Sequence, residues 1–409
     1  MRILIYGINY SPELTGIGKY TGELVDWLSA QNHECHVITT PPYYPAWKIA
    51  KGFSPFRFTR EEKKNLAIYR CPLWVPKKPR TISRLLHLFS FTLTSFPILV
   101  SQFAWKPDVI VCIAPSFFCA PQAILFSKLA GAKSWLHFQD FEICAMFKTG
   151  MMSSLKNLNN LAHSVQSLFT RRFSRVSTIS HTMCDSAAKR RVSFDPIVFF
   201  PNWVDIDFIT PRADSRTFRE KWGIDRKTKV VLYSGNLGEK QGLELIVESA
   251  GLLADEKNIL FVIVGDGAHR SALQNMVASH GLKNIRFYPL QAYELLPDLL
   301  KLADIHLIIQ KKGSGDSFLP SKLTSILSAG GHFIVTAEKE TELYHIVNAH
   351  PGIGTVIPPE NPELMASTIV TILKNHTGSY NPVARTYAET HLGKETVLSR
   401  FENELTQLL

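Results

Sequence analysis

Short apolar runs alternate with amphipathic stretches along the whole chain. The apolar runs predict strands, and the stretches between them, with apolar residues at helical spacing, predict helices. Uninterrupted runs rich in Val and Ile, such as 230–233 and 260–265, are typical of parallel strands buried on both faces. The predicted strands are 2–8, 34–39, 108–113, 133–138, 175–179 and 197–200 in the first half, and 229–233, 259–264, 285–288, 304–309, 332–336 and 354–357 in the second. Helices are predicted between them, for example at 18–30, 117–130 and 154–173.

The alternation also predicts the fold class and the domain organisation. Strands that alternate with helices indicate α/β domains whose parallel sheets are covered on both faces. A polar stretch, 205–229, separates the two series of strands, and 409 residues suffice for two domains. We predict two Rossmann-like, doubly wound domains over 1–205 and 206–380 that face each other across a cleft, and a C-terminal helical segment, 381–409, that returns to the first domain. Ligands are expected at the carboxyl ends of the strands.

Basic residues are concentrated in the first half of the chain. The formal net charge is +10; residues 1–205 hold 24 Lys/Arg against 12 Asp/Glu, whereas 206–409 hold 21 against 23. The segment 48–106 alone has 12 basic residues and two acidic ones. A basic surface favours an anionic partner, either an anionic lipid surface or a phosphorylated substrate. Nucleic acid is not expected, because the chain has no zinc-ligand spacing, RNA-binding aromatic signature or basic recognition helix.

One apolar stretch, 85–105, is about as long as a membrane span. It contains His87, Pro97 and Gln102, and a predicted strand follows it, so placing it across a bilayer would take a helix from the first sheet. We interpret it as a long crossover helix packed on one face and preceded by basic residues at 77–84. Its exposed part could then lie in a membrane interface. A fully buried helix with a solvated basic approach and a transmembrane helix are the alternatives.

The cysteines and the N-terminus bear on the cellular compartment. Six cysteines are scattered without CxxC pairs, and three of them lie in apolar settings typical of buried free thiols. The apolar run 3–8 is too short for a secretory signal and continues directly into Asn9, Pro12 and Glu13. These features predict a protein of the reducing cytoplasm.

A glycine-bearing loop follows the first predicted strand of each half, SPELTGIGK at 11–19 and SGNLGEKQGLE at 234–244. Glycines at a strand-to-helix turn let backbone N–H groups approach a phosphate at the positive end of the helix. The strand at 34–39 is followed by no Asp or Glu that could hold a ribose, which counts against a nicotinamide enzyme. Two tight turns without a ligand are the alternative. The candidate ligand-binding residues of these loops are Gly16, Gly18, Asn236, Gly238 and Lys240.

Two further loops of the second half follow predicted strands. The loop 311–324 contains KKGSGDSF, and Pro320 is well placed for the first turn of the helix after it. The turn VGDG at 264–267 could border a nucleotide base or be a plain turn. The candidates for contacting phosphate, ribose or base are Gly265, Ser321, Lys322, Leu323 and Thr324, through side chains or backbone amides.

In the first half, the sequence LHFQD at 136–140 ends a predicted strand. His137 and Asp140 therefore lie at a carboxyl end, where parallel sheets bind ligands. His137 could orient a substrate hydroxyl, and Asp140 could accept a hydrogen bond from the substrate or fix the imidazole. We take both as candidate catalytic residues; a structural histidine is the alternative.

Together, these motifs resemble those of the GT-B glycosyltransferases of family 4. The first glycine loop, FPNWVD at 200–205, the second glycine loop and PSKL…AGG at 320–331 occur in the family's order across nearly the whole chain. The stretches YGINYSPELTGIGKYTGEL at 6–24 and PPYYP at 41–45 are more specifically similar to glycosyltransferases of colanic acid biosynthesis that are described as fucosyltransferases.

The resemblance implies two GT-B domains and the retaining, metal-independent transfer of a sugar from a nucleoside diphosphate sugar, without any cofactor. The nucleotide would bind the C-terminal domain and the acceptor the N-terminal one. The implied donor is GDP-fucose, with a UDP-sugar as the alternative. The implied acceptor is a polyprenyl-diphosphate-linked oligosaccharide at the inner face of the cytoplasmic membrane, to whose anionic surface the basic region 48–106 would attach the enzyme peripherally.

The sequence departs from the family pattern at several positions. The usual Arg and Lys of the second glycine loop are Asn236 and Gln241 here. The usual Glu-x7-Glu pair falls near Ser317 and Ser325, with only Asp316 acidic nearby. No catalytic glutamate is therefore carried over from the family. Diphosphate binding is assigned instead to Lys240 and Lys322.

Other interpretations of the sequence remain. Asp205-Ile206-Asp207 has the form of a metal-binding D-x-D, but it directly follows PNW at the domain boundary, and we interpret it as structural and expect activity in EDTA. A sugar-nucleotide epimerase would share the fold but needs acid and base carboxylates in the cleft. A non-catalytic membrane-bound scaffold would bind lipid but not nucleotide.

Overall fold

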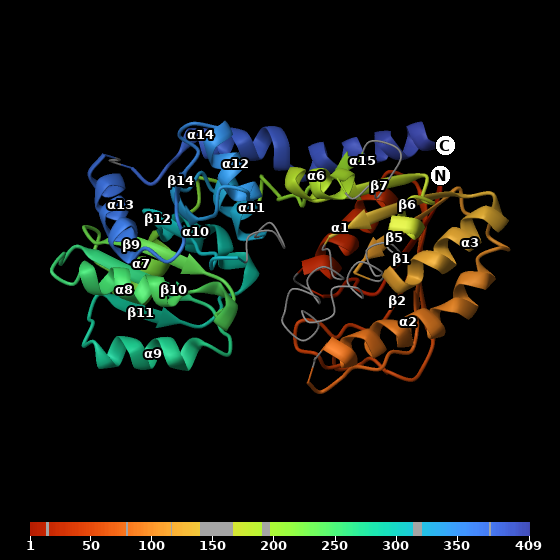
Figure 1. Ribbon diagram of the computed structural model, residues 1–409, viewed down its shortest axis with the longest axis horizontal. Coiled ribbons are helices and arrows are strands. Elements are labelled where there is room, and N and C mark those ends of the chain that lie inside the picture. Colours follow the sequence, from red (N-terminus) through yellow and green to blue (C-terminus); the bar gives the residue numbers. More distant parts are fainter. Residues whose placement is uncertain are drawn as a thin grey trace. The chain divides into compact units, whose positions relative to one another are not determined.

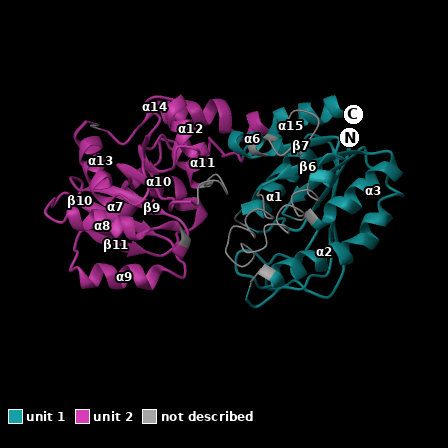
Figure 2. Cartoon of the chain, in the orientation of Figure 1, with its two compact units in different colours: residues 1–201, 398–409 teal, residues 202–397 magenta. Residues whose placement is uncertain are grey.

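The chain divides into two compact units (Figures 1 and 2). Unit 1 comprises Met1–Pro201 and Leu398–Leu409, and unit 2 comprises Asn202–Val397. The computed structural model describes residues 1–13, 16–78, 81–115, 117–139, 167–189, 197–313, 321–375 and 378–409. Each unit has its own sheet and its own hydrophobic core, as expected of separate domains.

Unit 1 is built on a sheet with the strand order β3-β4-β2-β1-β5-β6-β7-β8. Neighbouring strands run parallel except β3 and β4, which form an antiparallel pair at one edge. The chain starts at β1 in the interior of the sheet, adds β2 on one side and later crosses to β5 on the other, so the switch point lies between β1 and β5. The strands are β1 (Arg2–Gly7), β2 (Glu34–Thr39), β3 (Thr59–Lys63), β4 (Leu66–Arg70), β5 (Val109–Ala114), β6 (Lys133–Phe138), β7 (Arg175–Thr178) and β8 (Val198–Phe199).

Two helices, α2 (Thr81–Ser101) and α3 (Ala120–Ala130), pack against the same face of this sheet (Figure 1). Their buried side chains form one cluster with alternate residues of β1, among them Leu4 and Tyr6. The Tyr6 hydroxyl lies 2.6 Å from Ser95 Oγ of α2 and donates to Gln122 Oε1 at 2.9 Å. Unit 1 also contains α1 (Gly16–Ala30), η1 (Phe117–Cys119) and α6 (His181–Lys189).

Within the described residues, α2 is the one helix long and apolar enough to cross a membrane, by length and composition alone. The side chains of Leu88, Phe91 and Leu99 are buried in the core of unit 1. The helix therefore packs on one face, as the sequence predicts.

Unit 2 contains a parallel sheet with the order β11-β10-β9-β12-β13-β14. The chain starts at β9 in the interior, adds β10 and β11 on one side, and then crosses to β12, so the switch point lies between β9 and β12. Both units are thus doubly wound α/β domains, and the predicted fold class is confirmed. The strands are β9 (Lys229–Ser234), β10 (Ile259–Val264), β11 (Ile285–Tyr288), β12 (Ile305–Ile308), β13 (Phe333–Thr336) and β14 (Thr355–Ile357).

The helices of unit 2 begin and end at residues suited to caps. Thr341 Oγ1 accepts from Tyr344 N at the start of α12, and Asn381 accepts from Ala384 N at the start of α14. The helix α7 ends at Gly223, which adopts a left-handed conformation. The helices are α7 (Arg216–Trp222), η2 (Glu239–Gln241), α8 (Glu244–Leu252), α9 (Arg270–Ser279), η3 (Tyr293–Leu295), α10 (Leu296–Leu302), α11 (Ser321–Ser328), α12 (Glu342–Ala349), α13 (Pro362–Asn375), α14 (Pro382–Tyr387) and the π-helical η4 (Ala388–Leu392).

The unit boundaries lie at 201/202 and 397/398, whereas the sequence places them at 205/206 and 380/381. The segment after Pro201 joins unit 2, because Val204 forms a parallel bridge with Gly393. The helix α14 also belongs to unit 2. The last turns of α15 (Lys394–Leu408) belong to unit 1, where Phe401 stacks on Phe200 with ring centroids 4.4 Å apart.

Candidate functional site

At the carboxyl edge of the unit 2 sheet, the loops after β9 and β10 are joined backbone to backbone. Gly235 N donates to the Val264 carbonyl, and Leu237 N donates to the Asp266 carbonyl, both at 2.9 Å. His269 N in turn donates to the Leu237 carbonyl at 3.0 Å. Because their backbone groups are paired with each other, the two loops form one rim next to the switch point.

This close approach requires glycine at two positions after β10. A Cβ atom at Gly265 would lie 1.9 Å from the Gly235 carbonyl oxygen, and one at Gly267 would lie 2.3 Å from that of Leu237. Both glycines also have positive φ angles, +150° and +157°. The sequence predicts a ligand beside Gly265, and the structure shows that this glycine also joins the two loops.

The Lys322 amine lies at the switch point and has no hydrogen-bond partner among the described residues. Lys322 is in the first turn of α11, which follows β12, and its Nζ atom is 3.9 Å from the centroid of the Tyr233 ring on β9. A Cβ atom at Gly235 would lie 3.2 Å from Nζ, so the glycine leaves space for the amine. Burial lowers the pKa of Lys322 to about 7.

A buried amine of this kind favours an anionic ligand. Burying a charge costs free energy unless an opposite charge or hydrogen bonds compensate it. The Tyr233 ring compensates in part through a cation–π contact. A phosphate oxygen near Nζ would supply the missing partner and raise the pKa of Lys322 again.

The second glycine loop holds the Tyr233 ring in place. The Tyr233 hydroxyl is hydrogen-bonded to Gln241 Oε1 and lies 2.9 Å from the Asn236 carbonyl. Gln241 stands where the family usually has Lys, and here it supports the aromatic ring beneath Lys322. The Asn236 side chain packs next to Gly238, where a Cβ atom would lie 3.2 Å from Nδ2.

Gln310 belongs to the same edge and was not identified from the sequence. It follows β12 and is 6% exposed, and its Oε1 atom has no hydrogen-bond partner within the described ranges. Its backbone N donates to Thr336 Oγ1 at 2.7 Å, and its carbonyl accepts from the same hydroxyl at 2.8 Å. A buried amide without a partner can bind a ligand hydroxyl or N–H group. Its place directly after a predicted strand is the signal that could have identified it.

The structure says less about the other candidates of unit 2. The side chains of Lys240 and Ser321 and the loop 314–320 lie outside the described part of the chain. Leu323 is 1% exposed and lies in a core cluster, and Thr324 is 2% exposed. The side chains of Leu323 and Thr324 are therefore packed inside the unit, and a ligand at this loop would contact their backbone.

In unit 1, a carboxylate lies in the turn where the sequence predicts a phosphate. Glu13 is buried; its Oε1 atom accepts from the backbone N–H groups of 43–44, at 3.1 and 3.0 Å, and its Oε2 atom accepts from Asn9 Nδ2 at 2.9 Å. A Cβ atom at Gly18 would lie 2.4 Å from Glu13 Oε2, and Gly16 has a φ of +62°. Both glycines therefore have a structural explanation, and Glu13 takes the place next to Gly18 where the phosphate was expected.

His137 is buried at the end of β6 and both of its ring nitrogens have partners. Nδ1 lies 2.8 Å from Ser177 Oγ, and Nε2 lies 3.0 Å from Gln139 Nε2. Burial lowers the pKa of His137 to about 3, so the ring is neutral at physiological pH. Contact with a substrate hydroxyl would require Gln139 to move, and these contacts therefore favour the structural alternative. The other predicted catalytic residue, Asp140, lies outside the described residues.

The buried histidines predict that acid destabilises both units. His137 in unit 1 and His306 in unit 2 each have a pKa of about 3, whereas an unfolded histidine has a pKa of about 6.5. Between these values the unfolded chain binds more protons, so stability falls as the pH falls. We expect each histidine to cost about 2 kcal/mol at about pH 5 relative to neutral pH.

Urea unfolding followed by circular dichroism at the two pH values measures this loss. His137→Gln should reduce the pH dependence, whereas His345→Gln, at an exposed position of α12, should leave it unchanged. If the free energy of unfolding changed with pH equally in the wild type and in His137→Gln, the assignment of a neutral His137 would be contradicted.

The D-x-D sequence at 205–207 forms a turn in unit 2. Asp205 Oδ1 accepts from Asp207 N at 3.1 Å and from Phe208 N at 2.8 Å. This carboxylate therefore accepts hydrogen bonds from the backbone of its own turn, as Asp side chains commonly do. Within the described residues, no group of three or more His, Cys, Asp or Glu side chains is placed to hold a metal ion.

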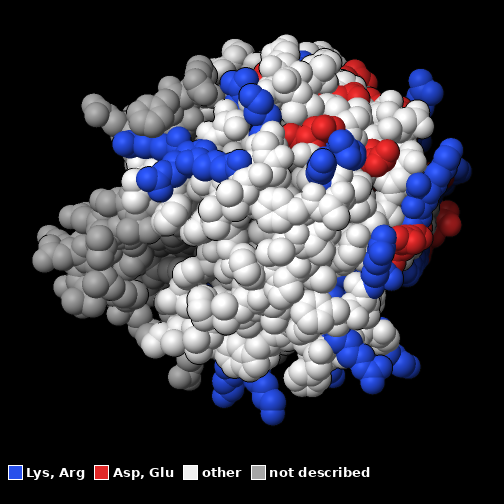
Figure 3. Space-filling view, turned by 90° about the vertical axis from the view of Figure 1, so that its right-hand side faces the viewer, with Lys and Arg blue, Asp and Glu red and all other residues white. Residues whose placement is uncertain are grey.

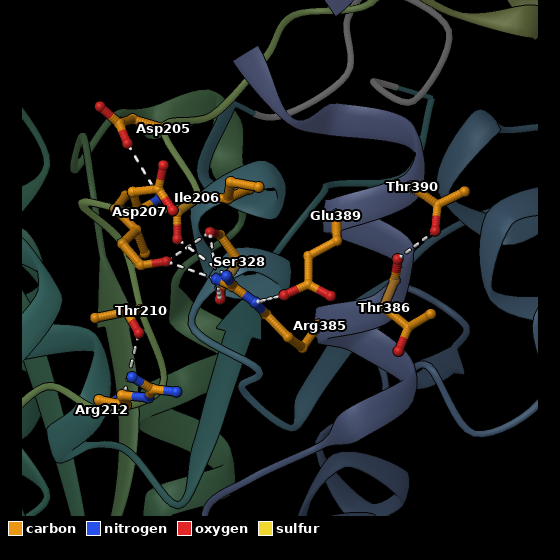
Figure 4. Close-up of polar contacts among 11 residues, drawn as sticks. Asp205, Ile206, Asp207, Thr210, Arg212, Ser328, Arg385, Thr386, Glu389 and Thr390 are labelled. Atoms are coloured by element: carbon orange, nitrogen blue, oxygen red, sulfur yellow. Dashed lines mark hydrogen bonds and ion pairs between the residues drawn. The ribbon is translucent and has the colours of Figure 1, made fainter. Parts of the chain in front are cut away.

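Arg385 of α14 fixes the backbone after this turn (Figure 4). It donates to the carbonyls of Ile206 at 3.0 Å and Ile209 at 2.9 Å, and to that of Ser328 on α11 at 2.7 Å. Glu389 accepts from Arg385 Nε at 2.6 Å. Through these contacts one guanidinium joins the start of unit 2 to the helix that carries Lys322.

Two family models match the chain, and between them they span most of both units. The model "Glycosyl transferase 4-like domain" matches residues 15–203, and "Glycosyl transferases group 1" matches residues 214–389. Over its full length the chain is 46% identical to a protein of Escherichia coli (strain K12) named as the colanic acid biosynthesis glycosyl transferase WcaI, with 99% of this chain and 100% of the relative covered. The chain therefore belongs to the group 1 glycosyltransferases of family 4, which have the GT-B fold.

More distant proteins share parts of the sequence or the fold. A probable glycosyltransferase of Pseudomonas aeruginosa, WbjE, is 27% identical over 53% of this chain and 54% of its own length. Sucrose-phosphate synthase from Thermosynechococcus elongatus superposes with a TM-score of 0.77 at 14% identity, covering 100% of this chain and 99% of that one. The Anabaena protein HepE, solved in complex with UDP, superposes with a TM-score of 0.70 at 13% identity over 100% of both chains. These structures show the fold.

Proposed function

We propose that this glycosyltransferase moves a sugar, with retention of anomeric configuration, from a nucleoside diphosphate sugar to a polyprenyl-diphosphate-linked oligosaccharide. The observation that carries the proposal is the buried, unpaired Lys322 amine at the switch point of unit 2. The name of the E. coli relative supports a role in building a colanic acid-like exopolysaccharide. We take GDP-fucose as the donor, with a UDP-sugar as the second candidate because HepE was solved with UDP.

Each group at the carboxyl edge of unit 2 has a part in donor binding. The Lys322 amine binds the diphosphate, because it is the buried cation without a partner in the described part of this edge. Gln310 Oε1 accepts a hydrogen bond from a hydroxyl of the ribose or of the sugar. The rim formed by the loops after β9 and β10 borders the nucleotide.

The chemistry then needs little more than positioning and charge stabilisation. The bond between the anomeric carbon and the diphosphate breaks, and the acceptor hydroxyl adds to the same face of the sugar. The leaving diphosphate oxygen can take the acceptor's proton, so the step requires no protein base. Lys322 stabilises the charge that develops on this oxygen, which is worth about 3–4 kcal/mol for one well-placed donor.

Titration calorimetry against GDP, UDP, GDP-fucose and UDP-sugars tests the proposal. We expect saturable binding of one nucleotide class, and GDP if the donor is GDP-fucose. Donor binding should also take up protons between about pH 7 and 9, because the diphosphate raises the pKa of Lys322 from its value of about 7. Repeating the titration in buffers of different ionisation enthalpy measures this uptake.

The same material distinguishes the alternatives. A product in which the sugar is joined to the lipid-linked acceptor, formed equally well in EDTA, supports metal-independent transfer, and its anomeric configuration reports retention. Release of a free epimerised sugar would support an epimerase, and the absence of nucleotide binding would leave a scaffold. Either of these results would refute the proposal.

A further inference from the structure

The outer face of α2 carries a continuous apolar stripe. Its members are separated by four and three residues in turn, and each is at least 44% exposed: Ile82, Leu86, Phe89, Leu93, Phe96 and Val100. The opposite side of the helix packs into the core of unit 1, so the exposure is not caused by a poorly packed helix. Single exposed apolar residues are normal on a protein surface, but six in one row along a helix form a continuous patch, and such patches mark interaction sites.

The neighbouring helix α3 extends this surface. Leu125 and Leu129, one turn apart on α3, are 55% and 68% exposed. The two helices are tied together by Gln122 Nε2, which donates to the Thr92 carbonyl at 3.1 Å, and both lie on the same face of the sheet. We call the eight side chains of the stripe and of α3 the α2–α3 apolar face.

The surroundings of this face are basic. The two helices contain no Asp or Glu, and Lys128 on α3 is exposed. Lys77, Lys78 and Arg84 are exposed at the N-terminal end of α2. Figure 3, which looks onto the end of unit 1 where α3 lies, shows a broad area without charged side chains that is bordered mainly by basic ones.

We propose that the α2–α3 apolar face inserts into the interfacial region of an anionic lipid bilayer, with α2 lying parallel to the membrane surface. Apolar side chains on one side of such a helix enter the boundary between headgroups and acyl chains, and basic residues at its ends contact anionic headgroups. Trp74 is 49% exposed, and its backbone N–H donates to Ser90 Oγ of α2 at 3.3 Å. Trp side chains favour this interfacial depth.

The charge pattern disfavours a second copy of the chain as the occupant. A spacing of four and three is also that of a coiled coil, in which charged residues beside the stripe select the partner helix. The residues beside this stripe include Ser83, Ser90, Thr94 and Ser101, with Arg84 as the one charged side chain of α2. Two such surfaces would also bring basic flanks of the same sign together.

Co-sedimentation with vesicles tests the proposal on the full chain. We expect the wild type to bind vesicles of phosphatidylcholine with about 30% phosphatidylglycerol, and to bind pure phosphatidylcholine at least about tenfold more weakly. The double variant Phe89→Ser/Leu93→Ser should lower binding to the anionic vesicles by about 100-fold, since burial of each side chain contributes about a factor of ten. The control Leu252→Ser/Leu290→Ser replaces two comparably exposed leucines of unit 2 and should bind like the wild type.

Several outcomes would overturn the inference. One is that the wild type does not bind the anionic vesicles, and another is that Phe89→Ser/Leu93→Ser binds them as well as the wild type does. A wild-type dimer in solution that Phe89→Ser/Leu93→Ser converts to monomers would also overturn it. Thermal unfolding of both double variants checks that the substitutions leave the fold intact, as expected for exposed positions. The assay contains neither nucleotide nor acceptor, so its result is independent of the proposed transferase activity.

Discussion

Replacing Lys322 with methionine is expected to weaken the use of the donor strongly and at the same time to stabilise the ligand-free enzyme. The functional loss follows from removing the cation at the switch point, and kcat/KM for the donor should fall by about 10²–10³-fold. Stability should rise because methionine fills the space of the lysine chain over Tyr233 without a buried amine. The expected gain in the free energy of unfolding near neutral pH is about 1–3 kcal/mol.

The pH dependence separates this gain from a packing effect. The pKa of Lys322 is about 7 in the folded chain, whereas that of an unfolded lysine is about 10.4. Between these values the unfolded state binds more protons, so wild-type stability should rise with pH across this window. The methionine variant should lack this rise, so the free energies of unfolding of the wild type and the variant should converge towards high pH.

Thermal and urea unfolding with and without nucleotide measure both effects. Lys257→Met, at an exposed position of unit 2, serves as the control and should change neither donor binding nor the pH profile. Unchanged donor kinetics in Lys322→Met would refute the assignment of the diphosphate to this amine. If the ligand-free variant were less stable than the wild type at neutral pH, the conclusion that the Lys322 amine is unpaired would be refuted.

Gly265→Ala is expected to destabilise unit 2 strongly. The new Cβ would lie 1.9 Å from the Gly235 carbonyl oxygen, and the φ of +150° is unfavourable for alanine. The oxygen belongs to the backbone and the Cβ is attached directly to it, so no side-chain rotation relieves the clash and the loops after β9 and β10 must separate. We expect a loss of more than about 3 kcal/mol in the free energy of unfolding, together with the loss of nucleotide binding.

Gly251→Ala is the matched control for this substitution. Gly251 lies within α8, and the nearest atom to a Cβ there is a Leu282 methyl carbon at 3.9 Å, an ordinary van der Waals contact. Alanine should therefore stabilise the helix by up to about 1 kcal/mol and leave nucleotide binding intact. Similar melting temperatures for the two variants would contradict the tight backbone approach at Gly265.

Four strands were predicted with the bounds that the structure shows. The predicted segments 34–39, 133–138, 259–264 and 285–288 coincide with β2, β6, β10 and β11. The antiparallel pair β3–β4 was missed. All five residues of β3 are exposed and its sequence TREEK has no apolar alternation, so its pairing depends on the neighbouring strand β4 alone.

The candidate site was predicted in part. Lys322 and the two glycine loops of unit 2 were identified because they follow strands in a parallel sheet. Gln310 was missed, because a glutamine after a strand is ordinary until burial leaves its Oε1 atom without a partner. His137 was considered catalytic from its place after a strand, and only its contacts with Ser177 and Gln139 favour a structural role.

The sequence by itself determined two parallel α/β sheets, a basic first half and the loops at which ligands are expected. These features depend on residue type and on spacing over a few positions, which are local properties of the chain. The tertiary structure decided which polar groups have partners. Glu13 is satisfied by backbone groups thirty residues away, whereas the Lys322 amine lies over an aromatic ring of β9 and has no hydrogen-bond partner within the described residues. Hydrogen-bond satisfaction depends on groups that are distant in the sequence, so only the folded chain distinguishes a buried carboxylate with partners from a buried amine without one.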